Sequence, residues 1–225
     1  MGNFDIGQFI LYMVALVFSL SLHEAGHAWM SSRFGDDLAR SQGRVSLNPM
    51  THVDPIGTLL FPAIAFFAHA PLLGWARPTP VNPLRWRNKR VANFWVSIAG
   101  IIGNLLIAIV AGIIIRVLFE TGVIMRGGAM TLVNSDSDVT LGAVKLVYGF
   151  FTLNIGLAVF NLLPIPPLDG SKVLASILPE SFESSIQALE QFGFVLLFIA
   201  VFTGVFSAIF RVVIPFAESL VFIGT

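Results

Sequence analysis

Residues 9–27 read FILYMVALVFSLSLHEAGH, an uncharged apolar run that ends in a His-Glu-x-x-His motif. On a helix, His23 and His27 lie one turn apart on the same face, so their imidazoles converge on one point. Such a pair supplies two ligands of a tetrahedral zinc ion. Glu24 flanks that point and is placed to take a proton from a water molecule that the metal activates. The stretch predicts a hydrolytic zinc site on a hydrophobic helix.

An alternative interpretation is that these histidines are buried core residues without a metal. Ionisable side chains at bilayer depth are costly and are functional by default, which favours the metal site. A catalytic zinc ion takes three protein ligands and keeps one position open. Asp169 is the candidate third ligand, because it follows a proline-rich break at the end of a later apolar segment. Taken alone, Asp169-Gly170 is equally well interpreted as a turn.

The composition is that of a membrane protein. Of the 225 residues, 56% are hydrophobic and 12% are charged, about half the charged share of a soluble domain. The formal net charge is zero, which gives no basis for binding nucleic acid. There is no cysteine, so disulfides and thiolate metal ligands are excluded and histidines and carboxylates must hold any zinc.

The hydropathy pattern predicts an all-α polytopic membrane protein with four or more transmembrane helices. We expect one membrane-embedded domain over residues 1–225, and a first segment that is retained, since it lacks the features of a cleaved signal peptide. After the motif helix we expect a small β or re-entrant region, with a short strand over Gly43–Leu47. The apolar segments are residues 6–30, 59–75, 91–118, 141–163 and 192–214.

Segment 59–75 is short and interrupted by prolines, which favours a re-entrant or buried piece over a single crossing. A single crossing there would also put the motif end of the first helix and Asp169 on opposite faces of the membrane. Without it, nine of the 13 basic residues share the motif side, which predicts a cytoplasmic motif end and an external N-terminus. These nine are Arg33, Arg40, Arg44, Arg77, Arg85, Arg87, Lys89, Arg90 and Lys172.

Two further histidines are weaker candidates. His52 is a possible additional ligand, although a hydrogen-bonded loop residue is the favoured interpretation. His69 is interpreted as an interfacial residue near the end of segment 59–75. Residues 78–90 form a proline-rich and basic loop, whose charges are expected to face water and lipid headgroups.

The His-Glu-x-x-His motif at 23–27 is followed by Asn-x-x-Pro-x-Pro-x-Leu-Asp-Gly at 161–170. This pair resembles the site-2 protease family of intramembrane zinc metalloproteases. Gly100-x-x-x-Asn104 matches another motif of that family, and residues 43–57 resemble its compact branch, which lacks a PDZ domain. The resemblance covers nearly the whole chain.

The resemblance implies a zinc endopeptidase that binds one zinc ion per chain through His23, His27 and Asp169. Glu24 would be the general base and then the acid for the leaving amine. Asn161 would contact the substrate or the developing oxyanion. The substrates would be transmembrane helices of other proteins within the lipid bilayer. An unwound segment of the substrate would be kept extended by pairing with the expected strand at 43–47.

The expected location is the plasma membrane of a prokaryotic cell, with a multi-pass chain and an active site towards the cytoplasm. The expected partners are membrane-protein substrates and lipid, with no nucleic acid, and the oligomeric state is open. Two rival functions are a metal transporter and an inactive scaffold that binds membrane helices. Glu24 argues against transport, which needs ligands but no base. The intact set of His23, Glu24, His27 and Asp169 argues against an inactive scaffold.

Overall fold

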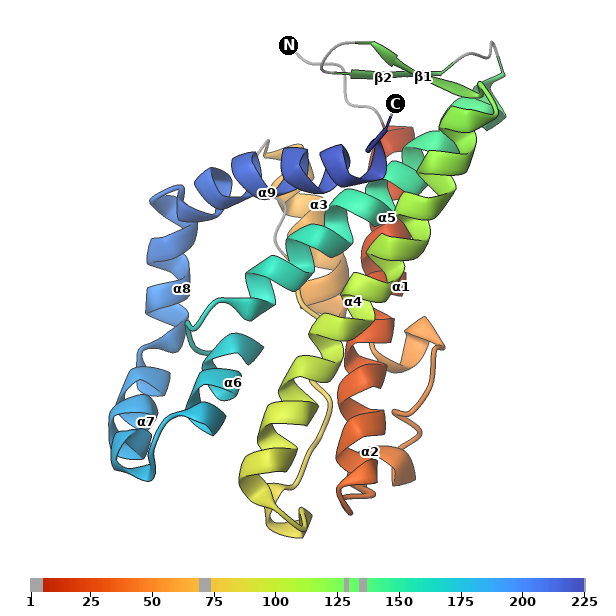
Figure 1. Cartoon of the computed structure of the whole chain (residues 1–225). Coiled ribbons are helices and arrows are strands. Elements are labelled where there is room, and N and C mark those ends of the chain that lie inside the picture. Colours follow the sequence, from red (N-terminus) through yellow and green to blue (C-terminus); the bar gives the residue numbers. More distant parts are fainter. Residues whose placement is uncertain (1–5, 69–73, 128–129, 134–136, 225) are drawn as a thin grey trace.

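Three long helices form the centre of the molecule (Figure 1). They are α1 (Ile6–Arg33), α4 (Lys89–Glu120) and α5 (Asp138–Leu162), and each is long and apolar enough to cross a membrane. The computed structural model describes residues 6–68, 74–127, 130–133 and 137–224. Helix α4 packs against both α1 and α5, and α1 also packs against α5. The prediction of an all-α polytopic protein is confirmed.

Side chains mark where two of these helices begin. The Asn88 side chain accepts a hydrogen bond from the backbone N–H of Val91 at the start of α4, and Ser137 does the same for Thr140 at the start of α5. Asparagine and serine are favoured at this position because the first backbone N–H groups of a helix have no partner within it.

The connection from α1 to α4 contains only short elements. The prediction of a strand at Gly43–Leu47 is wrong. Backbone carbonyls in and after this stretch accept hydrogen bonds from side chains and do not pair with another strand. His52 Nε2 donates to Ser46 O (2.8 Å), and Arg44 donates to Thr51 O and Pro78 O. The short elements are α2 (Leu38–Ser41), η1 (Pro49–Thr51), the π-helical η2 (Pro55–Leu60), α3 (Phe61–Phe67) and η3 (Pro83–Arg85).

The described part of segment 59–75 agrees with a re-entrant piece. The apolar helix over Pro55–Phe67 is shorter than the roughly 20 residues that a membrane crossing needs. The two ends of the α1–α4 connection meet, since Arg87 N–H donates to Phe34 O (3.0 Å). The connection therefore begins and ends at the same end of the bundle, as expected (Figure 1). His69 lies outside the described residues.

Strands occur instead at the opposite end of the bundle, between α4 and α5 (Figure 1). The strand β1 (Ile124–Gly127) pairs with β2 (Met130–Val133) in antiparallel register, with Ile124 opposite Val133.

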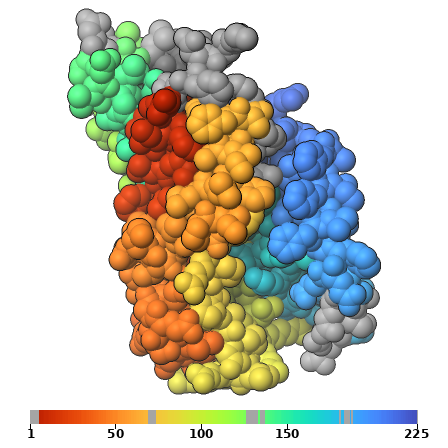
Figure 2. Space-filling view, turned by 180° about the vertical axis from the view of Figure 1, so that it is seen from behind, coloured from red at the N-terminus to blue at the C-terminus, as the bar shows by residue number. Residues whose placement is uncertain are grey.

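The C-terminal part runs from α6 to α9 and lies beside the central helices. Figure 2, which views the molecule from behind, shows α8 and α9 on the side away from α1. The single helix expected over 192–214 is interrupted at Gly204, where φ is +78°, and α8 and α9 meet at an angle of 66°. These elements are α6 (Asp169–Ile177), η4 (Glu180–Phe182), α7 (Glu183–Gln191), α8 (Gly193–Phe202) and α9 (Val205–Val221).

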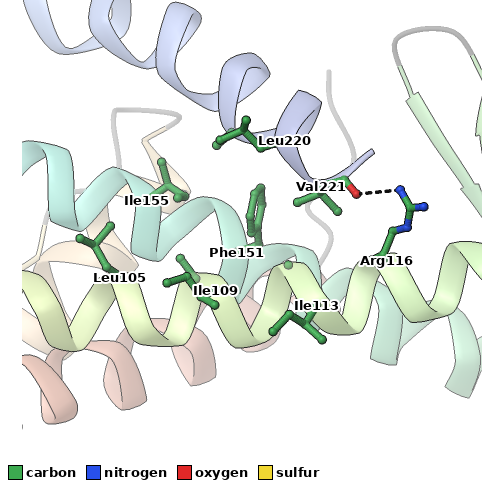
Figure 3. A pocket seen from close by; sticks show the side chains of 11 residues that line it. Leu105, Ile109, Ile113, Arg116, Phe151, Ile155, Leu220 and Val221 are labelled. Atoms are coloured by element: carbon green, nitrogen blue, oxygen red, sulfur yellow. Dashed lines mark hydrogen bonds between the residues drawn. The ribbon is translucent and has the colours of Figure 1, made fainter. Parts of the chain in front are cut away.

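Helix α9 crosses over α4 and α5 and leaves a cavity of about 370 Å³ between the three helices (Figure 3). Its lining is almost entirely apolar, with Phe151 and Ile155 from α5 facing Leu220 and Val221 from α9. At one end, Arg116 donates to Val221 O (3.3 Å) and ties α4 to the end of α9.

Candidate metal centre

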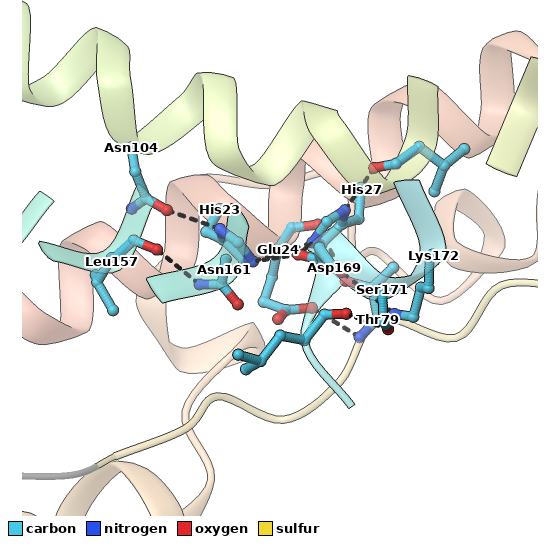
Figure 4. A network of polar contacts seen from close by, with 12 residues as sticks. His23, Glu24, His27, Thr79, Asn104, Leu157, Asn161, Asp169, Ser171 and Lys172 are labelled. Atoms are coloured by element: carbon cyan, nitrogen blue, oxygen red, sulfur yellow. Dashed lines mark hydrogen bonds and ion pairs between the residues drawn. The ribbon is translucent and has the colours of Figure 1, made fainter. Parts of the chain in front are cut away.

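Three side-chain atoms from two distant parts of the chain converge between α1 and α6 (Figure 4). The Nε2 atoms of His23 and His27 are 3.0 Å apart. Asp169 Oδ2 lies 3.2 Å from the first and 3.1 Å from the second. All three residues are buried, with at most 9% of their surface exposed, so bulk water does not surround these atoms.

The three atoms fit a zinc ion. Ligand bonds of about 2.0–2.1 Å in tetrahedral geometry separate neighbouring ligand atoms by roughly 3.3 Å, close to the observed triangle. The donor set of two imidazoles and one carboxylate is that of catalytic zinc proteases, and it leaves a fourth position open.

The other nitrogen of each histidine is bound to an atom that can only accept. His23 Nδ1 lies 2.7 Å from Asn104 Oδ1, and His27 Nδ1 lies 2.6 Å from Val96 O. Both Nδ1 atoms therefore carry the proton, which leaves the lone pairs of both Nε2 atoms directed at Asp169. Three proton acceptors that face one another in a buried site favour a bound cation, and such outer hydrogen bonds are the usual means of orienting metal ligands.

Asp169 is held in a similar way. Lys172 Nζ lies 3.2 Å from its Oδ1 atom, which leaves Oδ2 for the metal. Asp169 is the first residue of α6, and α6 begins where α5 has just ended. A Cβ atom on Gly170 would lie 2.2 Å from Leu162 O, so the close approach of the two helix ends requires glycine after the aspartate.

Helix α4 contributes no ligand, but one of its faces forms a wall of the site. Val96, Gly100 and Asn104 are spaced at i, i+4 and i+8 and therefore share that face. A Cβ atom on Gly100 would lie 2.6 Å from both His23 Cε1 and His27 Nε2. The glycine at this position makes room for the two imidazoles. From the sequence, Gly100 was identified only as part of the Gly100-x-x-x-Asn104 motif.

Glu24 lies close to the two histidines, and its ligand atom is within 4.8 Å of theirs. Asp169 is the better candidate for the third ligand, because its Oδ2 atom lies 3.2 Å from His23 Nε2 and 3.1 Å from His27 Nε2. Glu24 Oε2 accepts a hydrogen bond from Thr79 N–H (2.8 Å), and Thr79 Oγ1 donates to Glu24 O (3.0 Å). This arrangement suits a base held next to the metal.

Thr79 was not among the residues expected at the site. The available signal is that Thr79 lies between Pro78 and Pro80, so it provides the sole backbone N–H of that tripeptide. The prolines favour an extended backbone, and this backbone carries the N–H to the Glu24 carboxylate.

Two other candidates are placed differently. His52 is buried, and its Nε2 donates to Ser46 O (2.8 Å); it does not belong to the metal group found among the described residues. Asn161 is in the last turn of α5, and its Nδ2 donates to Leu157 O (3.0 Å). Figure 4 shows Asn161 in the same group of side chains as His23 and Glu24, and its contact with substrate stays a prediction.

Comparison with known proteins identifies the class. Residues 11–200 match the family described as Peptidase family M50, and the chain belongs to this family of site-2 proteases. It is therefore a membrane zinc metalloprotease, and zinc is its cofactor. The family match supports a metalloprotease and gives no support to the metal transporter or the inactive scaffold.

Individual relatives are bacterial. The chain is 34% identical over 187 residues to "Putative zinc metalloprotease YwhC" of Bacillus subtilis, covering 83% of this chain and 78% of that protein. It is 28% identical over 194 residues to "Putative zinc metalloprotease Rip2" of Mycolicibacterium smegmatis, covering 86% and 67% of the two chains. No solved structure matches the chain significantly.

Proposed function

We propose that this protein is an intramembrane protease that hydrolyses peptide bonds in or beside transmembrane helices of other membrane proteins. One observation carries the proposal: the metal-ligand atoms and Glu24 lie within a bundle of helices long enough to span the membrane. His23 and His27 belong to one of these spans, so a peptide bond reaches them at membrane depth.

The proposed roles follow from the contacts. His23, His27 and Asp169 hold one zinc ion, which when bound polarises the substrate carbonyl and makes water more acidic. Glu24 uses Oε1 to accept the proton of the attacking water, because Oε2 is occupied by Thr79 N–H. Glu24 then returns this proton to the leaving amine. Asn161 contacts the substrate near the reacting carbonyl.

The substrate class follows from the setting of the site. Peptide bonds of a membrane helix are hydrogen-bonded and covered by side chains, so the substrate must unwind locally before it reaches Glu24. We do not propose that the unwound segment pairs with a strand at residues 43–47, because the structure has no strand there.

We place the protein in the plasma membrane of a prokaryotic cell, with the site towards the cytoplasm. Support comes from the basic residues at the motif end of the bundle and from the bacterial relatives. The chain lacks cysteine, so single cysteines at Leu84, Ser181 and Val139 give a clean labelling test. A membrane-impermeant thiol reagent added to intact cells should label position 139 alone, whereas labelling at 84 or 181 would contradict this orientation.

Cleavage itself is tested in proteoliposomes that contain the purified protein and one of a panel of tagged single-span membrane proteins. We expect cuts whose positions, determined by mass spectrometry, fall within or next to the membrane segment. A zinc chelator should stop the reaction and added zinc should restore it. Cuts confined to soluble regions, or cleavage after complete metal removal, would disprove the proposal.

A further inference from the structure

A chain of buried amides connects a metal ligand to the two neighbouring spanning helices. Asn104 on α4, Asn154 on α5 and Ser19 on α1 are all fully buried. Asn104 Nδ2 donates to Asn154 Oδ1 (2.9 Å), and Asn154 Nδ2 donates to Ser19 Oγ (2.7 Å). The first of these amides also binds His23, so the chain begins at the metal centre.

Backbone carbonyls fix the direction of every bond in this chain. Asn154 Nδ2 also donates to Phe150 O (2.8 Å), and Ser19 Oγ donates to Ala15 O (2.6 Å). A carbonyl can only accept. The Ser19 hydroxyl proton is thus committed to Ala15, its lone pair faces Asn154, and the NH₂ group of Asn154 must point towards both Ser19 and Phe150.

The orientation of Asn154 then determines that of Asn104. With its NH₂ group committed, Asn154 presents Oδ1 to Asn104, which must answer with its own NH₂ group. The Oδ1 atom of Asn104 is left facing His23 Nδ1 (2.7 Å). His23 therefore carries its proton on Nδ1 and keeps the Nε2 lone pair free for a metal.

The two histidines differ in their need for this support. His27 Nδ1 is bound to the backbone carbonyl of Val96, which cannot exchange a donor for an acceptor. His23 is bound to a side-chain amide, whose oxygen and nitrogen exchange places when it rotates by half a turn. A rotated Asn104 would present NH₂ to Nδ1 and favour the tautomer with its proton on Nε2, which competes with zinc.

We propose that Asn154 is a positioning residue for zinc binding, which acts through Asn104 to hold His23 in the tautomer that binds metal. The proposal rests on the proposed role of His23 as a zinc ligand. Asn154 touches neither the ligand atoms nor Glu24 in the described contacts, so its effect on the metal must be transmitted by Asn104.

The test compares three variants of the 225-residue protein in detergent. Asn154→Leu keeps the number and branching of the side-chain heavy atoms and removes all polar groups. Asn154→Asp, as a neutral carboxylic acid, keeps one acceptor for Asn104 and one donor. Thr152→Val is the matched control, because Thr152 lies in the same helix and, among the described contacts, its hydroxyl binds Tyr148 O of that helix (2.9 Å).

Three measurements are made on each purified protein. Competition with a chelator gives the zinc dissociation constant. The visible absorption of the cobalt-substituted protein reports the geometry at the metal. The side-chain ¹⁵N NMR of histidine-labelled, metal-free protein reports which nitrogen of His23 is protonated, and His23→Ala assigns the signal among the four histidines.

We expect Asn154→Leu to weaken zinc binding by up to about tenfold. This is the smallest loss of affinity typical of removing a residue that is hydrogen-bonded directly to a metal ligand. Its cobalt spectrum should change and its His23 signal should show Nε2 protonation, whereas Asn154→Asp and Thr152→Val should resemble wild type. Wild-type zinc affinity and spectra in Asn154→Leu, or an equal loss in the Leu and Asp variants, would overturn the proposal. If His23→Ala instead kept the zinc content of wild type, the proposed ligand set would be disproved. Failure of the proposed ligand set is therefore distinguishable from failure of the proposed role of Asn154.

Discussion

The bundle of α1, α4 and α5 and the arm formed by α8 and α9 are held together by different interactions. In the bundle, buried side chains of one helix bind another helix, as His23 binds Asn104 and Asn104 binds Asn154. In the arm, the hydroxyl groups of Thr203 and Ser219 bind carbonyls of their own helices. Its largest exposed side chains are Phe194, Phe198, Phe202 and Phe216.

This difference has a physical reason. Apolar contacts in lipid tolerate small rotations and shifts, whereas hydrogen bonds between buried amides and carbonyls specify both distance and direction. A metal site needs its ligand atoms in one geometry, so directional contacts surround it. Substitutions that disturb the directional contacts around the metal site should therefore change metal binding or catalysis, and substitutions in the arm should change stability alone.

The largest effect is expected from Glu24→Gln. The amide cannot accept the proton of water, so activity should fall by at least about 10²-fold. Zinc content should stay at that of wild type, because the three ligands are untouched. His23→Ala and Asp169→Ala should lose zinc as well as activity, as measured by metal analysis of the purified proteins. Equal zinc contents in all three variants would contradict this separation of roles.

The next effect is expected from Gly100→Ala, which places a methyl group against both imidazoles. Displacing the ligands should weaken zinc binding by roughly 10–100-fold, the range seen when the surroundings of metal ligands are altered. Gly142→Ala is the control, since a Cβ atom there meets nothing within 4 Å. Competition with a chelator measures the zinc affinity of both variants, one at a helix glycine beside the metal site and one at a helix glycine without close neighbours. Equal affinities would show that the site tolerates the added methyl group.

A smaller effect is expected where the bundle holds the end of α6. Arg90 donates to Ser176 O, Ile177 O and Leu178 O and so binds the last carbonyls of the helix that begins with Asp169. Arg90→Gln should lower the free energy of unfolding by about 1 kcal/mol, because the site is partly open to solvent. It should also weaken zinc binding several-fold. Arg85→Gln, at an exposed arginine of the same basic stretch, should leave both quantities unchanged in denaturation and chelator titrations.

The smallest effect on the site is expected in the arm. Gly204 has a φ of +78°, so Gly204→Ala should cost about 1 kcal/mol of stability through backbone strain. Zinc affinity and turnover should equal those of Gly142→Ala, because no ligand contacts the arm in the described structure. A loss of zinc binding in Gly204→Ala would show that the bend between α8 and α9 is coupled to the metal centre.

Several features were predictable because they depend on residues close together in the chain. The spans follow from long apolar runs, and the pair His23 and His27 follows from helix geometry, which puts residues i and i+4 on one face. Asp169 required the combination of two motifs, since its position after a proline-rich break is also that of a turn. The strand expected at 43–47 failed because side chains and not a partner strand bind the backbone nearby.

What the sequence indicated by itself is the chemistry: the candidate ligands, the candidate base and the membrane setting. The tertiary structure decided how that chemistry is held in place. Thr79 reaches Glu24 across 55 residues, Asn104 reaches His23 across 81, and Asn154 reaches Ser19 across 135. No local period encodes such contacts. They exist because helices α1, α4 and α5, and the loop that carries Thr79, pack closely enough for these polar groups to bind partners that are distant in the sequence.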